Sequence, residues 1–253
     1  MSDGAPAFFA IAAALLLGLA LERLAPHAPG RATWLANVGL WAVATALRAL
    51  CFGGAEWRVA RWTEASGFGL LPHVGAPAWL ALAASVAGLD LVSWAWHRTN
   101  HALPVLWRFH RVHHADPVLT VATSLRFHPG EILLSVPVRL AAIALLGAPA
   151  AGVALFEAVF GAANALEHGN FDLPARLECA LGLVWVTPAL HRRHHSVLRE
   201  EHDSNYGTIF SLWDRVARSR TEGASADHFA LGLPAGATGE PTSLAAMLAE
   251  PMR

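Results

Sequence analysis

The chain has 253 residues, of which 55% are hydrophobic and only 15% are charged, and its formal net charge is −1. Because a soluble globular domain usually contains about 25% charged residues, this composition favours a protein that is partly dissolved in lipid. Because the net charge is near zero, no nucleic-acid partner is implied.

Five apolar stretches are predicted to cross a membrane, which takes about 20 residues in a helix. The first three cover roughly residues 5–24, 33–52 and 78–96. The apolar stretch 132–166 is too long for one helix, and the segment 147–152, with its glycines and proline, divides it into a hairpin of two spans. No basic residue precedes the first span, so we expect a retained anchor and not a cleaved signal peptide.

Three further segments lie outside these spans. Residues 56–71 are a candidate for a short amphipathic helix on the far membrane surface. Residues 173–190 form a shorter, interrupted apolar run, which we interpret as a partly embedded or interfacial helix. The chain after residue 220 is rich in Ala, Gly, Pro and Ser and is expected to be loosely ordered. We therefore divide the chain into N-terminal anchor spans with a far-side loop (1–76), a central domain that carries most of the histidines (77–220) and a tail (221–253).

Five spans place the segments 22–32 and 98–127, and everything after His168, on one side of the membrane. This shared side carries most of the arginines, whereas the other side has chiefly Arg58 and Arg61. The positive-inside rule then makes the shared side cytoplasmic. We predict an all-α, multi-pass protein of the cytoplasmic membrane, with its N-terminus outside and its C-terminus inside.

Three clusters hold eight of the 14 histidines, and a ninth stands between the second and third clusters. These nine residues are His97, His101, His110, His113, His114, His168, His191, His194 and His195. Residues three and four apart share one face of a helix, so the imidazoles of each cluster converge. A structural zinc site closes with four ligands, which is far fewer than are present here. The clusters therefore predict a site for two metal ions on the cytoplasmic side.

Imidazole binds Zn, Cu, Fe and Ni, so the ligand type alone does not choose the metal. For oxygen chemistry on a lipid, two irons are the natural pair because they share the electrons that cleave O2. Two alternatives stay open at this point: a histidine-rich interfacial surface, and a metal-binding membrane protein with no oxidase activity. A membrane metalloprotease is disfavoured, since the sequence contains no His-Glu-x-x-His.

The residues around the clusters resemble the fatty acid hydroxylase/sterol desaturase superfamily. The resemblance covers roughly residues 80–216 and rests on the joint pattern of six segments. These are 90–101 (DLVSWAWHRTNH), 106–114 (LWRFHRVHH), 125–131 (LRFHPGE), 187–196 (TPALHRRHHS), 203–207 (DSNYG) and 212–215 (LWDR). One departure is Val216-Ala-Arg-Ser, which stands where the family usually has a Phe-Gly-Thr-like ending.

The resemblance implies a membrane-embedded, O2-dependent, non-haem di-iron enzyme that hydroxylates or desaturates lipids or sterols. It also implies that the nine histidines are the metal ligands and that zinc can replace iron on purification. Asn164 and His168 occupy a place where some family members have His-x3-His. Asn164 is therefore expected to ligate weakly or through water, or else to position His168.

Four residues are further candidates, either for binding a metal or for contacting a metal-ligating histidine. Three more belong to the segments that carry the resemblance. The four are His128, Asn164, Asp90 and Glu157, and the three are Asn205, Tyr206 and Asp214. Ionisable residues inside spans are functional hypotheses by default. Asp90 is accordingly a hydrogen-bond acceptor or charge balancer for the site, or else a polar residue packed against another helix.

Arg139 and Glu157 lie at similar distances from the 147–152 hairpin, which predicts an ion pair between the fourth and fifth spans. We favour a structural role for this pair and expect Glu157 to face the bundle interior. Tyr206 is expected to make a hydrogen bond that holds the loop after the third cluster. His202 lies outside the clusters and is interpreted as a surface residue.

We expect hydroxylation first and desaturation second. Both reactions begin with hydrogen abstraction and diverge afterwards, so the metal ligands alone do not decide between them. The substrate, such as a sterol, hopanoid, fatty acyl lipid, carotenoid-like isoprenoid or ether lipid, would reach the metals from the membrane through an apolar slot. A separate electron donor, of ferredoxin or cytochrome type with its reductase, is expected to dock at the arginine-bearing cytoplasmic face. The alternative function is that of a zinc-binding membrane protein without oxidase activity.

Overall fold

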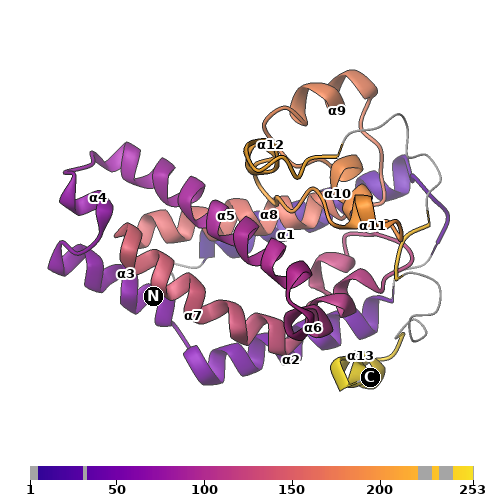
Figure 1. The fold of residues 1–253 in the computed structure, drawn as a ribbon, viewed down its shortest axis with the longest axis horizontal. Coiled ribbons are helices and arrows are strands. Elements are labelled where there is room, and N and C mark those ends of the chain that lie inside the picture. Colours follow the sequence, from indigo (N-terminus) through magenta and orange to yellow (C-terminus); the bar gives the residue numbers. More distant parts are fainter. Residues whose placement is uncertain (1–4, 31–32, 222–229, 234–241, 253) are drawn as a thin grey trace.

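The structure, a computed structural model, describes residues 5–30, 33–221, 230–233 and 242–252. Over these residues the regular structure is helical apart from isolated β-bridges, which confirms the all-α prediction (Figure 1). Five helices are long and apolar enough to cross a membrane. They are α1 (Ala5–Leu24), α2 (Trp34–Phe52), α5 (Ala78–Ala102), α7 (Pro129–Leu146) and α8 (Ala150–Glu167). These helices match the five predicted spans, and α5 continues beyond its expected end to include the first histidine cluster.

Shorter helices lie around the bundle. Those at the end opposite the histidines are α3 (Ala55–Ser66) and α4 (Leu70–His73) (Figure 1). The others are α6 (Pro104–His114), η1 (Thr123–Leu125), α9 (Ala175–Leu181), α10 (Pro188–His194), α11 (Arg199–His202), α12 (Leu212–Val216), α13 (Leu244–Ala249) and η2 (Glu250–Met252).

The long helices pack in the order α1, α8, α5, α7 and α2, each against the next. The core between α5, α7 and α8 contains Leu89, Ile143, Val153 and Phe156, all of them buried. This packing brings the C-terminal ends of α5 and α8 to the same end of the molecule as the N-terminal end of α7. The histidines gather at this end.

The predicted hairpin between α7 and α8 is present and turns at Gly147. Gly147 has a φ of 69°, a left-handed conformation that glycine adopts without the strain of a Cβ atom. The backbone N–H groups of Gly147 and Ala148 both donate to the carbonyl of Ile143 and so close the end of α7. Pro149 follows in extended conformation and begins α8.

The amphipathic helix predicted over residues 56–71 is divided in two. The chain leaves α3 at Gly67, whose φ is 67°, and α4 begins at Leu70. Ala60 and Thr63 of α3 are buried, and α3 packs against α7 and α8. The far end of the bundle is therefore covered by this helix.

Residues 173–190 do not form the single helix that we predicted. Ala175–Leu181 form α9 and residues 188–190 begin α10, but the backbone between them is not helical because it is tied to another part of the chain. The backbone N–H of Val186 donates to the carbonyl of Ile209 at 3.0 Å. Several large apolar side chains of this region are exposed: Leu177, Leu183, Val184 and Trp185. A partly embedded position of the segment therefore remains a prediction.

The expectation of a loosely ordered tail is wrong for residues 242–252. The Ser243 side chain accepts a hydrogen bond from the backbone N–H of Ala246 and starts α13. Met247 is fully buried against α2 and α6, in a cluster with Leu40 and Val112. The Arg111 guanidinium donates to the backbone carbonyl of the buried Glu250 at 2.7 Å. Residues 230–233 are also described, and the backbone carbonyl of Ala230 accepts from the N–H of Val197 at 3.0 Å. The tail expectation for residues 222–229, 234–241 and 253 lies outside the described residues.

Replacing Met247 with alanine is expected to destabilise the protein by about 2–5 kcal/mol, the usual cost of truncating a buried methionine. Chemical unfolding of the detergent-solubilised protein would measure this change in the free energy of unfolding. Met252 to alanine is the matched control, because the Met252 side chain is exposed. Equal stability of the two variants would show that the C-terminal helix contributes nothing to the fold.

Candidate metal centre

All nine histidines of the clusters converge at one end of the bundle, although they come from four parts of the chain. The C-terminal half of α5 carries the first cluster, α6 the second and α10 with its C-cap the third, and His168 caps the end of α8. The side chains form two groups, and within each group the nitrogen atoms available to a metal lie within 4.8 Å of one another. The five-histidine group contains His97, His101, His110, His114 and His194, and the four-histidine group contains His113, His168, His191 and His195.

The ring nitrogens of the five-histidine group are arranged as in a metal site. The Nδ1 atom of His97 donates to the carbonyl of Tyr206 at 2.8 Å, and that of His194 donates to the carbonyl of Ser204 at 2.6 Å. A neutral ring that carries its proton on Nδ1 presents only a lone pair at Nε2. The two Nε2 atoms nevertheless lie 3.0 Å apart. Two lone pairs at this distance repel each other unless a cation lies between them.

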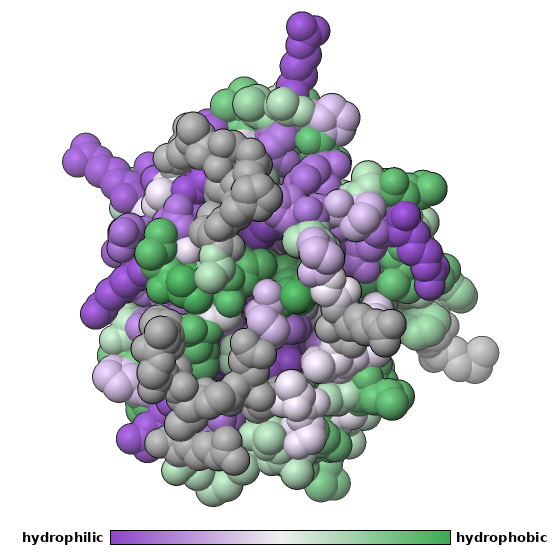
Figure 2. Space-filling view, turned by 90° about the vertical axis from the view of Figure 1, so that its right-hand side faces the viewer, coloured by the Kyte–Doolittle hydropathy of each residue, from purple (hydrophilic) through white to green (hydrophobic). Residues whose placement is uncertain are grey.

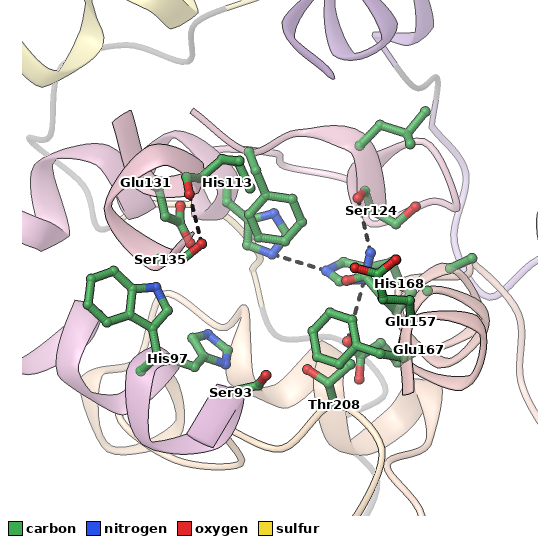
Figure 3. A pocket seen from close by; sticks show the side chains of 18 of the residues that line it. Ser93, His97, His113, Ser124, Glu131, Ser135, Glu157, Glu167, His168 and Thr208 are labelled. Carbon is green, nitrogen blue, oxygen red and sulfur yellow. Dashed lines mark hydrogen bonds and ion pairs between the residues drawn. The ribbon is translucent and has the colours of Figure 1, made fainter. Parts of the chain in front are cut away.

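The four-histidine group repeats this arrangement around His168. Its Nδ1 atom donates to the backbone carbonyl of Asn164 at 2.6 Å. Its Nε2 atom lies 3.0 Å from Nε2 of His113 (Figure 3). The same atom lies 2.9 Å from Nε2 of His191. Metal–nitrogen bonds of about 2.0–2.1 Å bring neighbouring ligand atoms to roughly such separations. The donor set of each group therefore fits a metal ion.

Burial keeps these rings in the form that a metal needs. The pKa values of His113, His191 and His195 are held well below the usual histidine value. Burial of the rings is the main cause, and repulsion from the neighbouring imidazoles is the second. Burial also lowers the pKa of His168 to about 4. Because neutral imidazole is the ligand for a metal ion, all four rings are in the binding form at neutral pH.

Glu131, from the first turn of α7, orients a histidine of the five-histidine group. Its Oε1 atom accepts from Nδ1 of His110 at 2.9 Å and from the side chain of Asn100 at 3.3 Å. A carboxylate behind a metal-ligating histidine fixes the ring and raises its basicity. The sequence showed Glu131 only as part of a motif, without a role.

Two other carboxylates face the histidine rings, and we did not select either from the sequence. Glu167 is buried and its oxygens lie 3.8 Å from Nδ1 of both His168 and His191. Asp203 lies 3.5 Å from Nδ1 of His101. As carboxylates, they would offset the positive charge that two metal ions would bring. An acidic residue at the end of a predicted span, beside His168, is a signal that could have pointed to Glu167.

Replacing Glu131 with alanine is expected to weaken metal binding by the five-histidine group about 10–100-fold, the usual effect of removing a carboxylate that orients a ligating histidine. Competition between the purified protein and a chelator for Zn²⁺ would measure this affinity. Glu131 to glutamine, which keeps an acceptor oxygen, should recover part of the loss. Glu200 to alanine is the control, because Glu200 is exposed. An unchanged affinity in the alanine variant would show that Glu131 does not support His110.

The interpretation of His202 as a surface residue is wrong. Its ring is half-buried and lies 4.5 Å from that of His114 and 4.8 Å from those of His101 and Trp107, measured between centroids. Burial lowers the pKa of His202 to about 4. His202 was missed because it belongs to α11, beyond the helix that carries the third cluster, and helical spacing does not link the two.

His128 and Asn164 are engaged elsewhere. His128 caps α7, since its Nδ1 atom accepts from the backbone N–H of Gly130 at 2.9 Å and its Nε2 atom donates to the carbonyl of Leu248 at 3.3 Å. With both ring nitrogens used, His128 has none for a metal. The Asn164 side chain donates to the carbonyl of Ser124 at 3.1 Å, and its own backbone carbonyl holds His168. Of the three roles considered for Asn164, the positioning of His168 is thus the one with a direct contact.

Asp90 lies in α5 and holds the loop after the third cluster, not a histidine. Its carboxylate accepts from the backbone N–H groups of Ile209 and Phe210, each at 3.1 Å. It also accepts from the indole of Trp213 at 2.7 Å. The role of a polar residue packed against another element therefore describes Asp90 best.

The motif residues Asn205, Tyr206 and Asp214 build the same loop. Asp214 accepts from the indole of Trp94 at 2.9 Å and from the backbone N–H groups of Tyr206 and Gly207. Asn205 has a φ of 52° and bonds through its side chain to the backbone of Thr221. Tyr206 takes part through its backbone: its N–H donates to Asp214 at 3.1 Å, and its carbonyl accepts from Nδ1 of His97.

A cavity of about 370 Å³ lies directly beside both histidine groups (Figure 3). Its lining includes His97 and His110 of the first group and His113, His168 and His191 of the second. Most of the remaining wall is apolar, with contributions from Ile11, Leu15, Leu89, Val92, Phe127, Ile132 and Phe160. This volume is within the range of pockets that bind small organic molecules.

The predicted pair of Arg139 and Glu157 is present and also lines the cavity. The two side chains approach to 3.9 Å, and Glu157 faces the interior as expected. Glu157 precedes Glu167 by ten residues of α8, which places it about 15 Å from the histidine end. Glu157 is therefore remote from both histidine groups.

Comparison with known proteins adds two findings. A family model described as "Fatty acid hydroxylase" matches residues 82–219. The ornithine lipid hydroxylase OlsE of Rhizobium tropici is 36% identical over 137 residues, which make up 54% of this chain and 37% of that protein. The similarity thus spans little more than a third of that relative. No solved structure shows a significant match.

Proposed function

Because the chain belongs to the fatty acid hydroxylase family, we propose that it is a membrane-bound, O2-dependent hydroxylase that inserts one oxygen atom into a C–H bond of a lipid. The observation that carries this proposal is the apolar cavity against both histidine groups. A lipid chain in this cavity would present a C–H bond directly to the metals. The name of the Rhizobium tropici relative supports a lipid as the class of substrate.

We propose that the nine histidines hold two iron ions, one in each group, with His202 at the edge of the five-histidine group. Bound iron supplies the chemistry that activates O2, with two electrons from outside, into an oxidant able to break an unactivated C–H bond. The carboxylates of Glu131, Glu167 and Asp203 would orient the ligating rings, because they face the Nδ1 atoms of His110, His191 and His101, respectively.

The other residues around the cavity orient the substrate and keep water away. The apolar wall matches a hydrocarbon and excludes water from the C–H bond that reacts. Residues of α1 and α2 both line the cavity, and these are the first and last helices in the packing order α1, α8, α5, α7 and α2. We propose that the lipid enters from the membrane between these two helices.

We propose that the histidine end faces the cytoplasm and receives electrons from a separate ferredoxin- or cytochrome-type donor with its reductase. Figure 2 shows this end, where hydrophilic side chains project among apolar patches. Arg98, Arg108 and Arg199 are exposed. Such a basic surface would attract an acidic partner and speed its docking.

The test is O2 uptake by the purified, iron-loaded protein with membrane lipid extracts and a ferredoxin system. Lipid-dependent uptake and a product heavier by one oxygen atom would support hydroxylation. A product lighter by two hydrogen atoms would reassign the protein as a desaturase. Tight binding of zinc, with no O2 uptake in any extract after iron loading, would instead favour the metal-binding alternative.

A further inference from the structure

Four charged side chains lie together at the end of the cavity remote from the histidines. They are Arg48 of α2, Glu56 of α3, Arg139 of α7 and Glu157 of α8. Arg139 follows Glu131 by eight residues on α7, and Glu157 precedes Glu167 by ten on α8, so the group is about 12–15 Å from the histidine end. Three of the four lie within candidate membrane spans, where charged residues are costly and usually functional.

One contact in this group is a structural tie. The Arg48 guanidinium donates to the buried Glu56 carboxylate at 2.6 Å and so joins α2 to α3. Such a short distance indicates a charge-assisted hydrogen bond. Arg48 and Glu56 therefore largely satisfy each other.

Arg139 and Glu157 make looser contacts. The Glu157 carboxylate lies 3.6 Å from Arg48 and 3.9 Å from Arg139, and both distances exceed that of a direct hydrogen bond. The Arg139 guanidinium instead sits over the rings of Phe156 and Phe160, at 5.5 and 5.9 Å from their centroids. The side chains of Arg139 and Glu157 are 26% and 25% exposed, and both line the cavity. A guanidinium donor and a carboxylate acceptor thus face the same space.

The charges in this group cancel, since two arginines stand against two glutamates. A ligand group with a net charge would therefore add an unbalanced charge inside the membrane, which is strongly unfavourable. An uncharged group that both donates and accepts hydrogen bonds fits instead. It would accept from Arg139 and donate to Glu157.

We propose that Arg139 and Glu157 form a recognition site for an uncharged polar group, a hydroxyl or an amide, carried by the lipid at about 12–15 Å from the carbon that reacts. The apolar wall between the two ends would hold the hydrocarbon in between. This inference rests on the proposed function for the reaction at the histidine end. The recognition itself requires only the protein side chains.

The experiment measures binding to metal-free protein in detergent, with tritiated 1-hexadecanol as the probe. Unlabelled hexadecane, hexadecanoate and hexadecylammonium serve as competitors. The wild-type protein should prefer the alcohol to the alkane by about tenfold or more, because a hydrogen bond to a charged group contributes on that order. It should also prefer the alcohol to both charged competitors.

The preference for the alcohol over the alkane should disappear in Arg139→Met and fall in Glu157→Gln, which preserves the shape of the side chain. Leu134→Ala is the matched control, because Leu134 lies on the same helix but is exposed. Size-exclusion profiles identify a variant that fails to fold, and Glu157→Gln then decides the matter. An unchanged alcohol preference in Glu157→Gln, or tighter binding of either charged competitor by the wild type, would overturn the proposal.

This binding assay separates the two proposals. Selective alcohol binding together with no oxygenation by the iron-loaded protein would leave the recognition site standing and refute the proposed reaction. Oxygenation without any alcohol preference would do the reverse.

Discussion

Replacing His191 with alanine is expected to lower the metal content from about two ions per chain to about one and to reduce hydroxylation at least about 100-fold, since even a residue behind a ligand is worth 10–100-fold. His191 is buried in the four-histidine group, with its Nε2 atom 2.9 Å from that of His168 and 3.2 Å from that of His195. Its removal leaves three imidazoles and a void where the fourth nitrogen stood. We therefore expect the four-histidine group to lose its ion while the five-histidine group keeps its own.

Elemental analysis of purified protein gives the metal content, and product formation gives the activity. His73 to alanine is the matched control, because His73 is exposed at the far end of the bundle. Two ions per chain and unimpaired turnover in the His191 variant would contradict the assignment of this group as a metal site. Loss of both ions would show instead that the two groups bind metal cooperatively.

Replacing Asp214 with alanine is expected to destabilise the protein by about 3–5 kcal/mol, because each buried donor left without an acceptor costs about 1–3 kcal/mol. The Asp214 carboxylate accepts hydrogen bonds from the Trp94 indole, from the backbone N–H groups of Tyr206 and Gly207 and from the Ser219 hydroxyl. The same substitution frees the Tyr206 carbonyl that orients His97. Metal affinity should therefore fall together with stability.

Thermal unfolding followed with and without added metal separates these two effects. Asp214 to asparagine keeps one acceptor oxygen and should give an intermediate loss of stability. If the alanine variant unfolds at the wild-type temperature, the loop after the third cluster does not depend on Asp214.

Local patterns were sufficient to predict the elements that carry the site. The apolar stretches gave the five long helices, and the spacing of the histidines placed each cluster on one side of a helix. The hairpin at Gly147 followed from a glycine and proline pattern that favours a turn. These signals are carried by neighbouring residues and need no knowledge of the tertiary structure.

Partners that are distant in the sequence could not be predicted in the same way. Asp90 looked like a candidate for the metal site, yet its carboxylate is used by backbone groups about 120 residues further along the chain. The composition of the segment around Met247 does not predict a buried residue. Its burial depends on a space between α2 and α6. His202 reaches the site through a turn between two short helices, which has no sequence period.

The buried carboxylates show the same limit. Glu167 is adjacent to His168 in the sequence, but its closeness to His191 follows from the contact between α8 and α10. Neutral histidine ligands leave the charge of two metal ions unbalanced, so acidic groups were expected near the site. Which acidic residues lie there depends on the fold. Glu131 likewise meets His110 because α6 packs against α7.

The most direct test of the central claim is isotope incorporation from ¹⁸O2 by iron-loaded protein supplied with a lipid extract and an electron donor. We predict a hydroxylated lipid that carries one labelled oxygen atom, formed by the wild-type protein and absent with the His191 to alanine variant. An unlabelled product, or an equal amount of labelled product from the His191 variant, would contradict O2-dependent hydroxylation at the two histidine groups.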